Sequence, residues 1–245
     1  MNSNILITIC ARGGSKGIPK KNIKPLNGIP LIYYSIDLAK KISKQYNSKI
    51  ALSTDDIDIL NTSKKNGLFT DYLRPKNLAN DNAGKVETLK DLIEYEEKLI
   101  NGKYDYILDL DVSSPLRNLE DLVNGFNILQ NDKKMLTLFS VSQPNRNPYF
   151  NVVEKNESTG YYELVKKLKE PIQSRQNAPI VFDMNSSFYW YKRSFFDTNF
   201  KSPITKNTGI YLIDHICFDL DHNKDFLFME YLINSNKLDF ELWKY

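Results

Sequence analysis

A glycine-rich, basic stretch follows the first apolar segment of the chain and is its strongest chemical signal. Residues 10–22 read CARGGSKGIPKKN and come directly after the apolar run at 5–9. The glycines let the backbone turn sharply and leave amide N–H groups free to face an anion. The basic side chains beside them are Arg12, Lys16, Lys20 and Lys21. Because each phosphate of a triphosphate must meet donors as it leaves water, this stretch predicts a triphosphate-binding loop.

The alternative for this loop is a solvated surface turn. Its position favours a ligand site, because ligands of open α/β sheets bind beyond the carboxyl ends of the strands. Two better-known phosphate motifs do not fit. Glycines at 13, 14 and 17 lack the G-x-G-x-x-G spacing, and Lys16 precedes Gly17 where a P-loop needs Gly-Lys-Ser/Thr. A nicotinamide enzyme and a P-loop ATPase are therefore both disfavoured.

Two carboxylates late in the chain form a candidate metal site. Asp219 and Asp221 come at the end of a strand predicted at 216–220, and strand alternation places both side chains on one side of the chain. Hard oxygen ligands suit Mg²⁺, which keeps several waters and takes phosphate oxygens as further ligands. The alternative is an exposed pair that caps the helix after it. The metal interpretation is favoured because the basic loop already predicts a phosphate ligand, whose oxygens Mg²⁺ would bind.

Three further residues are weaker candidates. Asp111 ends an apolar strand that also carries Asp109, and carboxylates on such a strand are costly to bury without partners. We expect Asp111 to face the metal, the nucleotide or a helix N-terminus. Arg175 could hold an acidic substrate bidentately, with a surface ion pair as the alternative. Arg74 lies in a turn before a proline.

Composition excludes several classes of protein. The net charge of +3 from 33 basic and 30 acidic residues implies neither a nucleic-acid nor a membrane partner, and no run approaches the length of a membrane helix. The polar N-terminus enters a strand too soon for a signal peptide. The two cysteines exclude a disulfide scaffold and are expected to be buried free thiols in a cytoplasmic protein. Two histidines are too few for a His-rich metal site.

Alternating strand and helix patterns must position these residues. Strands are predicted at 5–9, 49–55, 104–112, 135–141, 187–191 and 216–220, and helices at 31–42, 56–66, 85–99, 118–129 and 223–233. This alternation predicts an α/β fold with a doubly wound, mostly parallel sheet. The alternation stops after residue 141, where prolines and a hairpin pattern at 151–166 follow. We therefore predict an α/β domain from residues 1–142 and 181–245, with 143–180 as a β-rich inserted arm.

Taken in order, these segments resemble the cytidylyltransferases that activate sialic acid and related nine-carbon acids. The matching blocks are residues 11–22, Arg74-Pro75 with Leu78-Ala79 and Asp81, residues 114–117 (SPLR), Arg175-Gln176 with Pro179 and Asn185, and Asp219-Leu220-Asp221. The resemblance runs over residues 5–232. It implies a Rossmann-like nucleotidyltransferase that joins CTP to a sialic, legionaminic or related nonulosonic acid and releases pyrophosphate.

The resemblance also implies roles, position by position. The nucleotide and its phosphates would be held by Arg12, Gly13, Gly14, Ser15, Lys16, Lys21, Asn22, Arg74 and Asp111. The sugar acid would be held by Arg175, Gln176 and Asn185, and Mg²⁺ by Asp219 and Asp221. Arg12, Lys21, Asp219 and Asp221 would be the catalytic residues. The arm at 143–180 would make the protein a homodimer.

The chain departs from this family at two places. Asp111-Val112-Ser113 stands where the family usually carries Gln-Pro-Thr, and Asn185-Ser186-Ser187 where Asn-Gly-Ala is common. Both departures bear on which acid fits. Two other functions stay open: a nucleotidyltransferase for a neutral sugar phosphate, in which Arg175 has no carboxylate to hold, and a nucleotide-binding module without turnover.

Overall fold

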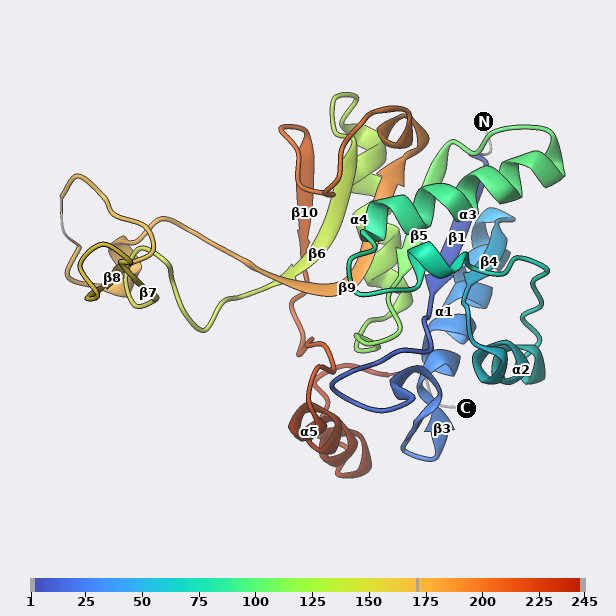
Figure 1. Ribbon diagram of the computed structural model, residues 1–245, viewed down its shortest axis with the longest axis horizontal. Coiled ribbons are helices and arrows are strands. Elements are labelled where there is room, and N and C mark those ends of the chain that lie inside the picture. Colours follow the sequence, from blue (N-terminus) through green and yellow to red (C-terminus); the bar gives the residue numbers. More distant parts are fainter. Residues whose placement is uncertain (1–2, 171, 243–245) are drawn as a thin grey trace.

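A six-stranded mixed sheet forms the centre of the computed structural model, which describes residues 3–170 and 172–242 (Figure 1). The strand order is β10-β6-β9-β5-β1-β4. The strands are β1 (Ile5–Cys10), β4 (Lys49–Ser53), β5 (Tyr106–Leu110), β6 (Thr137–Ser142), β9 (Asp183–Lys192) and β10 (Thr208–Leu212). Strand β9 is antiparallel to both neighbours, and the other pairs are parallel. The predicted α/β fold with a mostly parallel sheet is confirmed.

Helices cover both faces of this sheet (Figure 1). Helices α1 (Leu31–Tyr46) and α4 (Leu119–Asn131) pack on one face, and α3 (Lys85–Ile100) packs on the other. Helix α2 (Ile57–Lys65) lies beside α1, and α5 (Asn223–Asn234) comes after the last strand of the sheet in the chain. Shorter elements are η1 (Lys21–Ile23), η2 (Lys76–Leu78), η3 (Arg175–Asn177), η4 (Arg193–Asp197) and the two-stranded pairs β2 (Pro25–Leu26) with β3 (Ile29–Pro30) and β7 (Val153–Lys155) with β8 (Tyr162–Leu164).

Period-two alternation of apolar residues along the central strands builds a core on each face. Leu108 of β5 and Trp190 of β9 pack with α1 and α4, whereas Ile107 and Tyr191 pack with α3. Burial of such side chains contributes about 1.5–3 kcal/mol each. The Trp190 indole N–H donates to the carbonyl oxygen of Leu122 at 3.0 Å and so fixes α4 over the sheet. Because both faces are buried, the strands are rich in apolar residues throughout.

One predicted strand is wrong, and one strand was missed. Residues 216–220 do not form a strand, because their backbone amides bind elsewhere: Ile216 N–H donates to Asp239, and Leu220 N–H donates to the carbonyl oxygen of Ser113. The sixth strand is instead β10, which pairs with β6 at the edge of the sheet. Its sequence TGIYL holds a glycine and only a weak apolar pattern. Asp219 and Asp221 therefore lie on an extended segment outside the sheet.

The segment between β6 and β9 stands away from the sheet as an arm (Figure 1). It carries η3 and the β7–β8 hairpin, in which Val153 is paired with Leu164, so the predicted hairpin is confirmed. The turn places Gly160 at φ 75°, where a glycine meets no steric cost.

The sequence also predicts that the chain has no membrane helix and that both cysteines are free thiols. Among the residues that the structure describes, no helix has both the length and the apolar character needed to cross a bilayer. Cys10 and Cys217 are free thiols, and burial raises the pKa of Cys10 to about 12 and that of Cys217 to about 11.

Protonation of His215 stabilises the contact between α4 and the segment that carries the acid pair. The His215 ring lies 3.0 Å from a carboxylate oxygen of Asp121 and stacks on Phe240. Burial alone lowers the His215 pKa, but hydrogen bonds to Asp121 and to the carbonyl of Ile216 outweigh it and raise the pKa. A raised folded-state pKa gives stability that is complete below the unfolded-state pKa of about 6.5 and is lost as pH rises through the folded value.

We therefore expect the substitution His215→Asn to cost more unfolding free energy at pH 6 than at pH 9, as measured by urea denaturation. The control is His222→Asn, because the His222 side chain is 81% exposed and caps α5, a position that Asn also suits. This control should change the free energy by less than about 0.5 kcal/mol. An equal cost of His215→Asn at both pH values would contradict the assignment.

Candidate active site

Two glycines anchor the basic loop after β1 to distant parts of the chain. Gly13 N–H donates to the Asp55 carboxylate at 3.0 Å, and a Cβ at Gly13 would come within 2.4 Å of a carboxylate oxygen of Asp56. A Cβ at Gly17 would come within 2.1 Å of the carbonyl oxygen of Asp221. Only glycine permits such close backbone approach. The loop is therefore held between the start of α2 and the acid pair.

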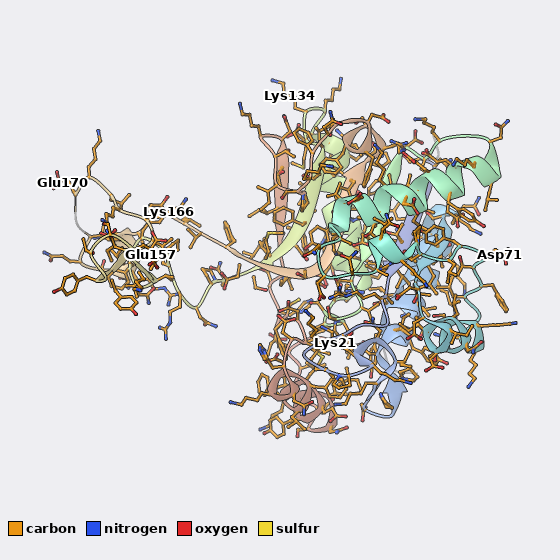
Figure 2. The ribbon with its side chains drawn as sticks, in the orientation of Figure 1. Lys21, Asp71, Lys134, Glu157, Lys166 and Glu170 are labelled. Carbon is orange, nitrogen blue, oxygen red and sulfur yellow. The ribbon has the colours of Figure 1, made fainter. Side chains whose placement is uncertain are left out.

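Lys21 and Asn22 complete the link between the loop and the acid pair. The Lys21 ammonium donates to the carbonyl oxygen of Leu220 at 2.6 Å and lies 3.9 Å from a carboxylate oxygen of Asp221. The Asn22 amide donates to the carbonyl oxygen of Arg12 at 2.9 Å and closes the loop on itself. Figure 2 shows Lys21 in the space between the loop after β1 and the segment that leads to α5. A cation is thus fixed beside the predicted metal ligands.

The other loop cations are paired with carboxylates. Asp81 accepts from Arg12 at 2.9 Å and from Lys16 at 2.5 Å, and Lys20 pairs with Asp58 at 2.7 Å. The bonds from Lys16 and then Arg12 lower the pKa of Asp81 despite some burial. These pairs are exposed, so each contributes little to stability. They nevertheless show that Arg12 and Lys16 converge on one point, where a single anion meets both.

Most of the predicted nucleotide-binding residues line one pocket of about 420 Å³, here called the loop pocket. The predicted residues on its wall are Arg12, Ser15, Lys16, Lys21, Asn22, Arg74, Asp111 and Asp221. Leu78, Asn80 and Asp81 also line this pocket. Gly13 and Gly14 do not line the pocket. Gly13 instead holds the loop in place, as described above.

Arg74 is buried against the carboxyl end of β4 while its side chain reaches the loop pocket. Its guanidinium donates to the hydroxyl and to the carbonyl oxygen of Ser53, both at 2.8 Å. Only 6% of Arg74 is exposed. Its place is therefore fixed by the sheet, and it adds positive charge to the pocket wall.

The acid pair lies where the loop pocket meets a second cavity. This α5 cavity, of about 700 Å³, is lined by Asp219 and Asp221, by Phe218 and Phe228, and by Asn145 at the base of the arm. Asp221 lines both spaces. Burial and then the charge of Asp221 raise the pKa of Asp219. A divalent cation shared by the two carboxylates would offset both the burial of Asp219 and its repulsion by Asp221, so the residues fit Mg²⁺.

This acid pair offers only part of a coordination shell. Among residues 3–170 and 172–242, no group of three or more His, Cys, Asp or Glu side chains is placed to hold a metal. A cation bound by Asp219 and Asp221 would therefore need waters and ligand oxygens, as Mg²⁺ takes in phosphate-transfer sites.

Lys85, at the start of α3, is a pocket residue that the sequence interpretation missed. Its ammonium lies 2.9 Å from a carboxylate oxygen of Asp109 and 3.1 Å from one of Asp111. Burial alone raises the pKa of Asp111, but Lys85 and the hydrogen bonds from Ser113 outweigh it and lower the pKa to about 2. Two carboxylates on an apolar strand signalled that a cation must lie nearby. Sequence could not say which basic residue supplies it.

The three predicted sugar-acid residues do not line either space. Arg175 and Gln176 lie in η3 on the arm, where the Arg175 guanidinium donates to the carbonyl oxygen of Pro144. Asn185 is buried in β9, accepts from the Ser140 hydroxyl at 2.6 Å and donates to Ser142 at 2.9 Å. Ser186 beside it has φ 56°, a left-handed conformation that costs a non-glycine residue about 1 kcal/mol. The glycine common there in the family would avoid that cost.

The fold and the loop pocket thus define an α/β protein built to bind a polyphosphate beside a pair of acids. The family model described as "Cytidylyltransferase" matches residues 6–226. The chain belongs to this cytidylyltransferase family.

Individual relatives agree with this family. The chain is 38% identical to "Post-translational flagellin modification protein B" of Campylobacter coli, over 96% of this chain and 97% of that protein. It is 36% identical to "CMP-N,N'-diacetyllegionaminic acid synthase" of Campylobacter jejuni, with the same coverage. The fold also matches a CMP:2-keto-3-deoxy-manno-octonic acid synthetase complexed with CTP, with a TM-score of 0.70, 15% identity, and coverage of 96% of this chain and 100% of that one.

Gly17→Ala tests whether the loop must touch the backbone of Asp221. Because a carbonyl oxygen cannot move as a flexible side chain can, the loop should shift, and we expect affinity for CTP to fall about 10-fold or more. Isothermal titration calorimetry measures this. The control is Gly102→Ala, where an added Cβ would meet its nearest atom at 3.7 Å. Wild-type affinity in Gly17→Ala would contradict the assigned role.

Proposed function

We propose that this cytidylyltransferase transfers CMP from CTP to a nine-carbon 2-keto sugar acid and releases pyrophosphate. The observation that carries the proposal is the loop pocket, where Arg12, Lys16 and Lys21 meet Asp221 of the acid pair. The substrate class is supported by the full-length relatives, among which are two named as CMP-N,N'-diacetyllegionaminic acid synthases. We infer that legionaminic acid or a close relative is the acceptor.

The loop residues would hold and orient the triphosphate. Arg12 and Lys16 converge on a carboxylate of Asp81, and a phosphate of CTP would take the place of that carboxylate. Lys21, fixed beside Asp221, would meet the phosphate nearest the acid pair. Charge-assisted bonds of this kind are about twice as strong as neutral ones. The base would then extend toward Leu78 and Asn80, which also line the loop pocket.

The reaction itself needs positioning and charge stabilisation. The anomeric hydroxyl of the sugar acid gives up its proton to water, and its oxygen forms a bond to the α-phosphorus in line with the bond to the bridging oxygen, which breaks as pyrophosphate leaves. Lys21 would stabilise negative charge on the α-phosphate oxygens as this happens. Asp219 and Asp221 would hold Mg²⁺, which when bound neutralises charge on the phosphate oxygens. The α5 cavity, which shares Asp221 with the loop pocket, leaves space for the acceptor on the far side of the acid pair.

The arm would make the protein a homodimer. Its exposed apolar side chains include Val153, Tyr161, Tyr162 and Ile180, which are 60%, 79%, 70% and 84% exposed. Such a small hairpin cannot bury them within its own chain, so a second copy is the partner we infer. Figure 2 shows Glu157 and Lys166 on the same arm, far from Lys21. Arg175 and Gln176 could then meet the sugar acid in the partner's site.

The proposed reaction is tested by pyrophosphate release with Mg²⁺. CTP, UTP, GTP and ATP would each be paired with N,N'-diacetyllegionaminic acid, sialic acid, an eight-carbon 2-keto acid and a neutral sugar phosphate. We expect turnover with CTP and a nine-carbon acid, and its loss when EDTA removes the metal. Release only with a neutral sugar phosphate, or with no pair at all, would exclude the proposed function.

The homodimer is tested by sedimentation velocity on Ile180→Glu. Replacing Ile180 by a charged residue removes about 1.5–3 kcal/mol of apolar burial from the interface. In a twofold-symmetric dimer this loss occurs twice, so the dissociation constant of the dimer should rise by at least about 100-fold. Leu99→Glu is the control, since Leu99 is 64% exposed on α3, outside the arm. A wild-type monomer, or an Ile180→Glu variant that stays dimeric, would contradict this interface.

A further inference from the structure

A part-buried ammonium joins two carboxylates beside the loop pocket, which it also lines. Asp109 and Asp111 lie two residues apart on and just beyond β5, and Lys85 reaches them from the first turn of α3. The Lys85 ammonium also lies 4.1 Å from the centre of the Tyr189 ring. Its three protons thus face two carboxylates and one aromatic ring.

The free hydrogen-bonding capacity of this cluster belongs to Asp111. Asp109 is 1% exposed and also accepts from the Thr8 hydroxyl. Asp111 has a side chain that is 23% exposed, and it accepts from Lys85, from Ser113 N–H and from the Ser113 hydroxyl. A carboxylate has about four acceptor positions, so three bonds leave one open. One cation between two anions also leaves the cluster with a net negative charge.

Asp111 lies at the reacting end of the pocket. Ser113, two residues on, accepts from the Leu220 N–H at 2.8 Å, and Leu220 separates the two carboxylates of the acid pair. Asp111 also lines the loop pocket, which Asp221 of the acid pair shares. Asp111 is therefore placed toward the acceptor.

We propose that Lys85 is a positioning residue for the acceptor, because it fixes Asp111 as an anionic hydrogen-bond acceptor for a hydroxyl or amide N–H of the sugar acid. This inference rests on the proposed function. The same charge repels the carboxylate of the sugar acid and so orients the substrate with its donors toward Asp111. A glutamine, the residue usual in the family at this position, would carry neither the charge nor the need for Lys85.

The resemblance to the family assigned Asp111 to the nucleotide, and the chemistry of the pocket argues against that role. Phosphate oxygens are acceptors and gain nothing from a second acceptor that is ionised. The nucleotide could use Asp111 only through a base or ribose donor. In that case a substitution of Asp111 would change the affinity for CTP. Measuring CTP affinity therefore distinguishes a role in nucleotide binding from a role in sugar-acid binding.

The test is a comparison of Asp111→Asn with the wild-type protein. This variant leaves the pair of Lys85 with Asp109 intact, so the fold is retained. We expect KM for N,N'-diacetyllegionaminic acid to rise about 10- to 100-fold, the range for a hydrogen bond to a charged group, while calorimetric Kd for CTP changes less than about twofold. An unchanged KM for the acid, or a CTP affinity that falls equally, would overturn the inference.

Two lysine variants test the positioning role. Lys85→Met removes the cation that holds Asp111, and Lys85→Arg keeps it, so KM for the acid should rise in the first and lie nearer the wild-type value in the second. Equal losses in both would contradict a role through charge. The control is Lys192→Met, since the Lys192 ammonium donates to the carbonyl oxygen of Asp132, outside both cavities.

The inference and the proposed function fail in different ways. If the wild-type protein turns over and Asp111→Asn has the same KM for the sugar acid, only the inference is overturned. No turnover by the wild-type protein with any sugar acid overturns both.

Discussion

The close contact between Gly17 and the backbone of Asp221 is the constraint on which the site depends. It joins a loop that follows the first strand to a segment some two hundred residues later, at a distance that leaves no room for a Cβ. Lys21 reinforces the contact through the carbonyl oxygen of Leu220. Once these segments touch, Arg12, Lys16 and Lys21 share one pocket with Asp221 of the acid pair. Neither group alone could both bind a triphosphate and stabilise the charge that develops on it.

The central sheet holds this contact in place from the other side. Leu220 N–H donates to Ser113 just beyond β5, and Arg74 is fixed to the end of β4. Lys85 from α3 offsets part of the negative charge of Asp109 and Asp111 beside the pocket. Each of these groups lies at the carboxyl end of a strand or at the start of a helix. The rigid part of the fold therefore sets distances that a flexible loop could not maintain.

Hydrophobic periodicity predicted most elements, because strands buried on both faces and amphipathic helices leave strong local patterns. It failed where partners are distant. Residues 216–220 are apolar like a strand, yet their amides bind Asp239 and Ser113 rather than a neighbouring strand. Residue types and order were enough to single out the basic loop and the acid pair, and the structure brings them together at Gly17 and Asp221. Lys85 was not, since only the folded chain shows which basic residue meets Asp109 and Asp111.

The arm and the site raise separate questions. Arg175 on the arm lies outside both cavities of its own chain, so its predicted contact with the acid depends on a second copy, whereas the predicted nucleotide residues that line the loop pocket all come from one chain. A crystal structure with CTP and Mg²⁺ tests that nucleotide site most directly. We expect phosphates along residues 12–21, with Asp81 displaced from Arg12 and the α-phosphate between Lys21 and Asp221. Phosphates bound elsewhere, or an Arg12–Asp81 pair that persists with CTP bound, would contradict it.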